Sequence, residues 1–283
     1  MELANIDFQK MPVLPQVLAG IMKLEDDNEV SFGELEKLIM ADQSVSTLIL
    51  KVANSPLYAR TGAIKTLKHA LSILGFKMVR SLIILASSKS LFQEGNYEKF
   101  RKYVWRHSIT TAIVAKELAG RLNHKNIQEE AFVCGLLHDI GKVILNNLDR
   151  KKFIGSIALA LEQKLSFRTT EHKLFGFDHL EVGAMAAKHW HLPEIFSICA
   201  ALHEEYKVGI IQGENDTLLQ IISFADFTIR SYEREDLPES ELAEGKSIAK
   251  VLDISEAEVE YFSREYPLLL EKDEFYQFCT GIL

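Results

Sequence analysis

The chain has 283 residues, of which 47% are hydrophobic and 25% are charged, and its formal net charge is −8. This composition is typical of soluble globular proteins and excludes a chain too polar to bury a core. Because acidic residues outnumber basic ones, no overall positive field would attract nucleic acid, and we do not expect nucleic-acid binding.

Cysteine usage and hydropathy predict the compartment. Three cysteines at wide spacing (Cys134, Cys199 and Cys279) argue against a disulfide framework and favour a reducing environment. The N-terminus lacks the basic and apolar regions of a signal peptide, and no apolar run approaches the roughly 20 residues of a membrane span. We therefore expect a cytoplasmic protein that does not contact a membrane.

The first third of the chain predicts a series of short helices. The segment "LPQVLAGIMKL" (residues 14–24) has apolar residues at helical spacing, and "SFGE" from Ser31 to Glu34 fits a capping box. Asp42 is expected to cap the helix "QSVSTLILKVANS". Gly75 is expected to break "TLKHALSILGFKMVRSLIILASS" into two helices.

Two helices of the middle third carry candidate functional residues. "WRHSITTAIVAKELAGRL" places His107 early in one helix, and "QEEAFVCGLLHDIG" places His138 and Asp139 near the end of the next. Gly141 is expected to close that second helix. A histidine and an aspartate amid apolar neighbours are costly to bury unless a partner satisfies them.

Three further helices carry polar residues of the same kinds. Asp178 and Glu181 fit a capping box, which places His179 in the first turn of a helix. "PEIFSICAALHEEY" predicts a helix that ends near His203. "TLLQIISFADFTIRSY" predicts a strongly apolar helix with Asp226 inside it.

No segment shows the sustained alternation that is typical of strands, so the predicted fold class is all-α. The last segment fits this, because "SEAEVEYFSREY" opens with a capping box from Ser255 to Glu258. The polar segment "QEGNYEK" near residue 95 marks a boundary. We expect an N-terminal helical part (1–95), a helical core (96–232) and a C-terminal helical extension (233–283).

The polar residues of the core helices predict a metal site. Imidazole nitrogens and carboxylate oxygens suit Fe, Mn, Ni or Zn, and helical bundles build such sites from inward-pointing side chains. The candidate ligands are His107, His138, Asp139, His179, His203 and Asp226.

Readings without a metal remain open. His138 and Asp139 can form a satisfied polar pair in a core, and Arg230, four residues after Asp226, can pair with it along the helix. A rival for the N-terminal part is a helix-turn-helix in "TLKHALSILGFKMVRSLII" that binds nucleic acid, although its basic residues form only a modest patch.

The order H…HD…H…H…D, with "HDIGK", resembles the HD superfamily of metal-dependent phosphohydrolases. The resemblance implies that His107, His138, Asp139 and Asp226 are the primary metal ligands. It also implies that Lys142 faces the phosphate of a substrate.

"HLEVG" from His179 and "HE" at His203 match additional histidine positions of the HD-GYP branch, which holds more than one metal. The chain departs from that branch at Glu204, where a further histidine is expected, and it lacks the "GYP" motif. The resemblance therefore does not imply hydrolysis of cyclic-di-GMP.

The N-terminal third is similar to the HDOD domain, an HD-related output module of bacterial signalling proteins. The segments "MPVLPQVLAGIMKL", "LIMADQSVSTLILKVANSPLYA", "IKTLKHALSILGFKMVRSLII" and "FGFDHLEVGAMAAKHWHLPE" carry this resemblance, over roughly residues 8 to 230. It implies an HD-type helical core with an HDOD-specific N-terminal part, and a signalling or regulatory role with a protein partner.

The alternative that the resemblance leaves open is an enzyme, a metal-dependent phosphohydrolase acting on a nucleotide or phosphoester. In that case Asp139 would bridge or orient the metal, and Lys142 would neutralise developing charge. Both hypotheses include a divalent metal, Fe, Mn, Ni or Zn, in the core.

Overall fold

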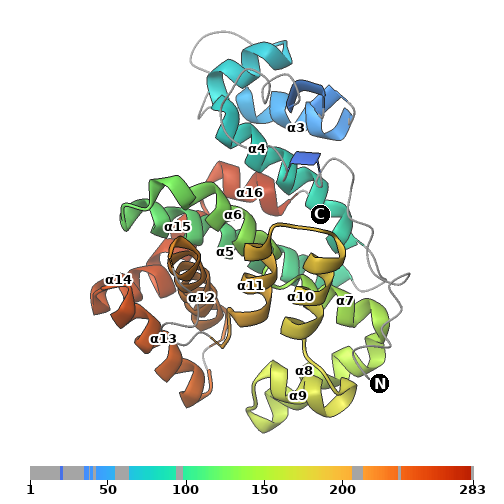
Figure 1. Ribbon diagram of the computed structural model, residues 1–283, viewed down its shortest axis with the longest axis vertical. Coiled ribbons are helices and arrows are strands. Elements are labelled where there is room, and N and C mark those ends of the chain that lie inside the picture. The colour runs from blue at the N-terminus through green and yellow to red at the C-terminus, as the bar shows by residue number, and fades with distance from the viewer. Residues whose placement is uncertain are drawn as a thin grey trace. The chain divides into compact units, whose positions relative to one another are not determined.

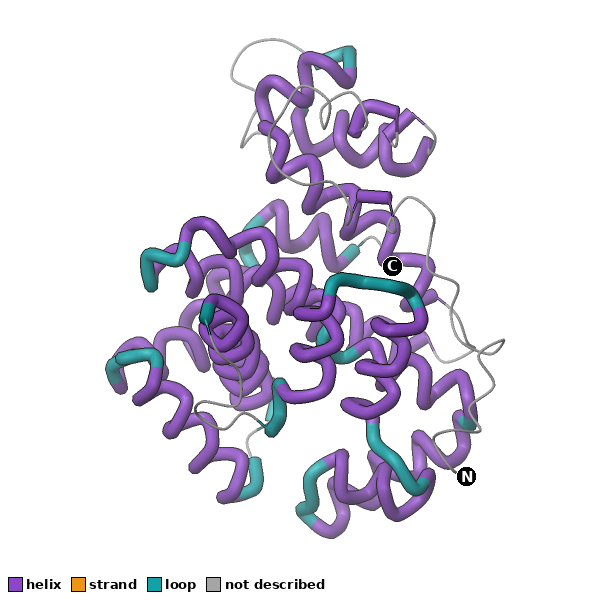
Figure 2. The backbone as a smooth tube through the Cα atoms, in the orientation of Figure 1, coloured by secondary structure: helices purple, strands orange, loops and turns teal. Residues whose placement is uncertain are grey.

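The computed structural model of the protein describes residues 20–21, 35–37, 39–40, 43–54, 64–93, 98–205, 213–234 and 237–281. Within these ranges every regular element is a helix, which confirms the all-α fold class (Figure 2). The caps predicted at Ser31–Glu34 and at Asp42 lie outside the described residues.

The chain divides into two compact units, of which the first is Val13–Gln93. Its described helices are α3 (Gln43–Ala53) and α4 (Leu67–Gln93), which pack against each other. Gly75 has a φ of 75° and a ψ of 163°, a conformation that glycine adopts readily. The predicted break of this helix at Gly75 is therefore confirmed.

No single described helix is long and apolar enough to cross a membrane. The two halves of α4, Leu67–Phe76 and Met78–Lys89, reach the necessary length and composition only when they are counted together, and the chain bends by 104° between them.

The second unit comprises Glu94–Leu283 and the first twelve residues. Its described α-helices are α5 (Glu98–Arg121), α6 (Gln128–Leu137), α7 (Ile140–Leu148), α8 (Arg150–Gln163), α9 (Phe167–Phe175), α10 (His179–His189), α11 (Glu194–Leu202), α12 (Glu214–Glu233), α13 (Glu239–Val251), α14 (Glu256–Glu260), α15 (Tyr266–Leu270) and α16 (Glu274–Thr280). The π-helical turn Tyr261–Glu265 joins α14 to α15.

Helix α5 is the central helix of this unit, because α6, α12 and α16 all pack against it (Figure 1). The approach of α6 is close: a Cβ added at Gly135 would lie 2.7 Å from the Cα of Ala112. Helix α16 is held to α5 by the buried indole of Trp105, which donates a hydrogen bond to the carbonyl of Cys279 (3.1 Å).

Local signals in the sequence fix several helix ends. The capping boxes predicted at Asp178 with Glu181 and at Ser255 with Glu258 are both confirmed.

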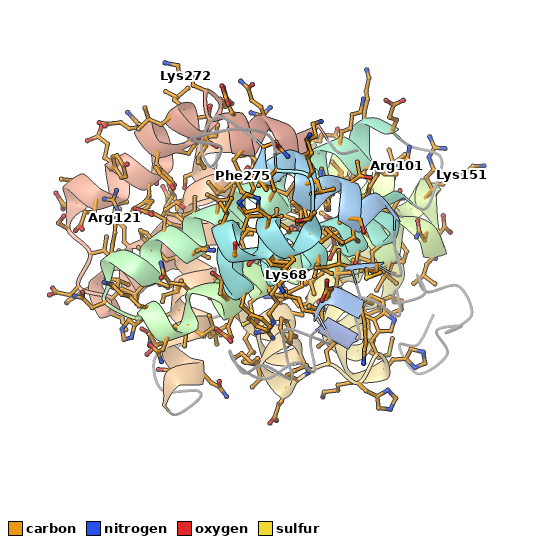
Figure 3. All side chains as sticks on the ribbon, turned by 90° about the horizontal axis from the view of Figure 1, so that it is seen from above. Lys68, Arg101, Arg121, Lys151, Lys272 and Phe275 are labelled. Carbon is orange, nitrogen blue, oxygen red and sulfur yellow. The ribbon has the colours of Figure 1, made fainter. Side chains whose placement is uncertain are left out.

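The three cysteines are free and buried, in agreement with the prediction that they form no disulfide framework. Charged side chains such as Arg121, Lys151 and Lys272 instead extend outward from the unit (Figure 3).

Candidate metal centre

The six residues predicted as metal ligands meet in the interior of the second unit. They come from α5, from the junction of α6 and α7, and from α10, α11 and α12, and α11 lies between α10 and α12 (Figure 1). None of them is more than 3% exposed: they are His107, His138, Asp139, His179, His203 and Asp226.

The junction of α6 and α7 sets His138 and Asp139 side by side. Helix α6 ends at Leu137 and α7 begins at Ile140, so the two residues occupy a turn, in which Asp139 has a φ of −97° and a ψ of 13°. The prediction that Gly141 closes the preceding helix is therefore wrong, because Gly141 lies in the first turn of α7.

Gly141 lets α7 approach α10. A Cβ at this position would overlap the carbonyl oxygen of His179 and would lie 3.0 Å from the amide nitrogen of Gly183. Both neighbours are backbone atoms, which cannot rotate out of the way, so a side chain would push the two helices apart. The glycine of "HDIGK" is thus needed to bring the start of α10, where His179 lies, against the Asp139 turn.

The first group of side chains surrounds one oxygen of Asp139 and one of Asp226. His107 Nε2 lies 3.1 Å from Asp226 Oδ1 and 3.5 Å from Asp139 Oδ2. His138 Nε2 lies 3.5 Å from Asp226 Oδ1 and 3.6 Å from Asp139 Oδ2. Two imidazoles and two carboxylates therefore face a common point.

The second group surrounds the other oxygen of Asp139. His179 Nε2 lies 3.6 Å from Asp139 Oδ1, and His203 Nε2 lies 3.5 Å from the same atom. Asp139 thus contributes one carboxylate oxygen to each group. The ligand atoms of Asp139, His179 and His203 all lie within 4.8 Å of one another.

Four of these inward-facing atoms are buried and have no hydrogen-bond partner among the described residues: His138 Nε2, His179 Nε2, His203 Nε2 and Asp139 Oδ1. Buried polar atoms are rarely left in this state. Two ligands bound about 2.1 Å from one ion lie about 3.0–3.4 Å apart, depending on the angle between them. The observed separations of 3.1–3.6 Å come close to that spacing and are mostly too long for hydrogen bonds. The donor set therefore fits a divalent cation.

The second ring nitrogen of each histidine is held from behind. His138 Nδ1 donates to the carbonyl of Gly135 (2.7 Å), and His203 Nδ1 donates to the carbonyl of Cys199 (3.0 Å). Each bond lies within the turn of helix that precedes the histidine. It leaves Nε2 facing the centre, which is the orientation that metal-binding histidines need.

The other two histidines are held by carboxylates that the sequence analysis missed. His179 Nδ1 lies 2.6 Å from Glu171 Oε2, and His107 Nδ1 lies 3.0 Å from Glu233 Oε2. Burial alone would lower the pKa of His107, but Glu233 and Asp226 outweigh it and raise the pKa to about 10. Glu171 likewise outweighs burial and raises the pKa of His179 to about 10.

These raised pKa values have a chemical consequence. In the metal-free protein at neutral pH both imidazoles are protonated at both ring nitrogens, and a cation that binds at Nε2 must displace the proton from that atom. The paired carboxylates then stabilise the neutral, metal-binding form through the remaining N–H bond.

Two cations lie against the acidic ligands. Lys142 Nζ is 2.6 Å from Asp139 Oδ2, and Arg230 Nε is 2.8 Å from Asp226 Oδ2. Burial alone would raise the pKa of both carboxyls, but Lys142 and Arg230 hold them well below their usual range. The predicted helical ion pair between Asp226 and Arg230 therefore exists beside the cluster and not instead of it.

Glu204 occupies the position where the resemblance to the HD-GYP branch expected a histidine. Its Oε1 atom lies 3.5 Å from His179 Nε2 and 3.9 Å from Lys142 Nζ. Burial would raise the pKa of Glu204, but His179 and Arg230 lower it, so the group is an anion at neutral pH. A carboxylate thus stands beside the second group.

A separate set of possible ligands consists of His172 and Glu181, which are exposed, and Asp178, which is buried beneath them. Its polar atoms already have partners: Arg168 donates to Asp178 (2.8 Å), and Asp178 and Glu181 form the capping box of α10. In the buried cluster, by contrast, four inward-facing atoms have no hydrogen-bond partner among the described residues.

Comparison with known proteins places the fold. The model of the HDOD domain family matches residues 11–206. A curated relative, an uncharacterised protein from Treponema pallidum (strain Nichols), is 23% identical over 225 residues, which cover 80% of this chain and 43% of the relative. The chain therefore spans less than half the length of that relative.

Solved structures share the same architecture. An HDOD domain protein of unknown function from Geobacter sulfurreducens is 26% identical, with a TM-score of 0.73 over 99% of this chain and 93% of its own. A proposed signal transduction protein from Marinobacter aquaeolei VT8 is 20% identical, with a TM-score of 0.71 over 96% of this chain and 59% of its own. A proposed metal-dependent phosphohydrolase from Shewanella amazonensis SB2B is 20% identical, with a TM-score of 0.58 over 91% of this chain and 90% of its own.

Proposed function

The chain belongs to the HDOD domain family, and from that premise we propose that it is a regulatory module of bacterial signal transduction whose helical core holds a divalent metal ion. The ligands are His107, His138, Asp139 and Asp226 in the first group, with His179 and His203 joining Asp139 in the second.

The observation that carries this proposal is the set of buried ligand atoms without hydrogen bonds. A polar knot that merely stabilised the core would pair its groups with one another, because an unsatisfied buried polar atom costs about 1–3 kcal/mol. Here the Nε2 atoms of His138, His179 and His203 all face Asp139 or Asp226 at 3.5–3.6 Å, and none of them forms a hydrogen bond within the described residues.

The residues of the chain have distinct roles in this proposal. Asp139 links the two groups by its two oxygens, Glu171 and Glu233 orient the imidazoles of His179 and His107, and Arg230 orients Asp226. A divalent ion bound there supplies Lewis acidity and lowers the pKa of a water bound to it. Fe, Mn, Ni and Zn all suit a donor set of imidazoles and carboxylates.

A second candidate function is hydrolysis of a nucleotide or phosphoester. The observation that favours it is Lys142, a residue only 8% exposed whose ammonium group lies at the edge of the cluster between Asp139 and Glu204. A lysine there can bind a phosphoryl oxygen and neutralise negative charge that develops on it. The same lysine would serve a regulatory module by binding a phosphorylated ligand.

The first test is the metal content of the purified protein, measured by inductively coupled plasma mass spectrometry. We expect Fe, Mn, Ni or Zn at close to stoichiometric amounts in the wild type and none in Asp139→Ala, because this substitution removes an oxygen from both groups. His172→Ala is the matched control, since it removes the exposed histidine of the separate set and leaves the buried cluster intact.

Each outcome has a clear meaning. Absence of metal from the wild type, even after reconstitution, would contradict the proposal, and equal loss of metal in His172→Ala would place the ion at the surface. Turnover of phosphoesters by the wild type, abolished in Asp139→Ala, would establish the enzyme. If metal is present without turnover, we expect Asp139→Ala to lower the melting temperature and the affinity for the protein partner together.

A further inference from the structure

Arg230 lies between two carboxylates, one on each side of its guanidinium. Its Nε atom donates to Asp226 Oδ2 (2.8 Å), and its Nη1 atom pairs closely with Glu241 Oε2. Arg230 is only 7% exposed, and the side chain of Glu241 is 11% exposed. The three groups form a largely buried series of ion pairs, Glu241–Arg230–Asp226, that runs from α13 to the candidate metal centre.

This series of ion pairs fixes the orientation of the Asp226 carboxylate. Because Arg230 holds Oδ2, the other oxygen, Oδ1, is the one that faces His107 and His138 at 3.1 and 3.5 Å. Glu241 in turn fixes the guanidinium, since a planar fork bound at both ends cannot swing away from Asp226.

The same series of ion pairs also balances the positive charge of Arg230. An uncompensated guanidinium beside Asp226 would repel a divalent cation and draw the carboxylate away from it, and in a buried site this effect is screened little by solvent. Glu241 offsets that positive charge from the far side of Arg230.

The packing of α13 is what allows Glu241 to reach Arg230. Gly245 lies four residues after Glu241, on the same face of α13. A Cβ at Gly245 would overlap the ring of Phe227 on α12. The absence of a side chain there lets the two helices come close along the face that carries Glu241. Helix α13 (Glu239–Val251) lies outside residues 11–206, the part that the family model matches.

We propose that Glu241 is a positioning residue of the metal centre: through Arg230 it orients Asp226 and offsets the guanidinium charge, so that α13 sets the affinity of the centre for a divalent cation. This inference rests on the proposed function, because it requires the first group to bind a cation.

The test is the dissociation constant for Mn²⁺, measured by calorimetry on the metal-stripped full chain, together with the melting temperature of the metal-free protein. We expect Glu241→Gln to weaken Mn²⁺ binding by about 10-fold, the low end of the range for loss of a group bonded directly to a metal ligand, because Glu241 acts one step further away through Arg230. Glu239→Gln is the matched control, because it makes the same change at an exposed position of the same helix. We expect its dissociation constant to stay within about twofold of the wild type, because an exposed charge is well screened.

An unchanged dissociation constant in Glu241→Gln, with a lower melting temperature, would assign Glu241 a purely structural role and overturn the inference. Equal weakening of Mn²⁺ binding in Glu241→Gln and Glu239→Gln would overturn it too, because the loss of any negative charge from α13 would then have the same effect. If the wild type binds no Mn²⁺ at all, the metal centre itself fails, and that result is distinct from the two others.

Should Glu241→Gln fail to fold, Glu241→Asp carries the test. It keeps the charge and shortens the side chain, so we expect the close contact with Arg230 to be lost and Mn²⁺ binding to weaken by several-fold. Wild-type affinity in this variant would contradict the inference.

Discussion

At the scale of single residues, the candidate metal centre has ionisable neighbours that do not contact the candidate ligands themselves. Glu244, on α13, lies partly buried near Arg230, and also near the carboxylates of Glu204 and Glu241. Burial raises the pKa of Glu244 to about 7; Glu204 and Glu241 add to this rise, and Arg230 only partly opposes it. Its ordinary value is 4.5.

This raised pKa predicts a pH dependence of stability. Between pH 4.5 and 7 the folded protein binds more protons than the unfolded chain, so the contribution of Glu244 to the free energy of unfolding falls as the pH rises through this window. We expect Glu244→Gln, which cannot ionise, to raise the melting temperature at pH 8 and to change it little at pH 4.5.

Thermal unfolding followed by circular dichroism at the two pH values checks this prediction. Glu239→Gln, exposed on the same helix, should give the same small change at both. A Glu244→Gln variant that loses stability at pH 8 would show that the carboxylate is held favourably, against the prediction.

Residue types and their order singled out six candidate ligands, and the structure brings these six side chains together, while their binding of a metal stays a prediction. The two carboxylates behind the histidines were not predicted. Glu233 is 126 residues from His107 in sequence, and no local pattern marks such a contact. Glu171 is eight residues from His179, but it reaches the imidazole only because α9 and α10 are joined by a tight turn at Gly176.

At the scale of secondary-structure elements, the centre depends on close helix contacts that small residues allow. Gly141 was expected to end a helix, a role that glycine often has. The structure shows a different reason for it, which is the approach of α7 to the backbone of α10 at His179. Sequence alone cannot distinguish the two, because the distinction depends on which helix lies opposite.

We expect Gly141→Ala to destabilise the protein by at least about 1–3 kcal/mol, the usual range for overpacking, because the added methyl group meets backbone atoms that cannot move aside. It should also lower the metal content, since α10 carries His179. Chemical denaturation and metal analysis of the same preparation measure both effects.

Gly155→Ala provides the matched control on α8. A Cβ at Gly155 would meet only the end of the Leu174 side chain, at an ordinary 3.5 Å. We expect this variant to be as stable as the wild type or more stable, since alanine favours a helix by about 1 kcal/mol over glycine. Equal stability of the Gly141 and Gly155 variants would contradict the role given to Gly141.

At the scale of the whole molecule, the candidate ligands and the groups behind them belong to one unit. Glu94–Leu283 contains both groups of side chains, together with Glu171, Glu233 and Glu241. Hydrophobic periodicity was enough to predict the helical class, and a glycine within an apolar helical segment was enough to predict the break at Gly75 of the other unit. It did not predict that the C-terminal helices reach back to α12, because Glu241 looks like any other charge in an acidic stretch.

This organisation predicts that the part of the second unit from residue 94 onward binds metal on its own. We expect a fragment of residues 94–283 to fold and to keep the metal content of the full chain. Circular dichroism and mass spectrometry of the fragment check this. A helical fragment without metal would contradict the prediction and would show that residues 1–93 are required for loading.

The place of Asp139 has a consequence for how such a centre is inherited. One side chain supplies an oxygen to each group of ligands and also accepts a hydrogen bond from the ammonium of Lys142. An aspartate codon becomes an asparagine codon by a single nucleotide change, and asparagine has nearly the same shape. A lineage with no further need of the ion therefore has a one-step route to a scaffold of the same fold, and the reverse change is just as short.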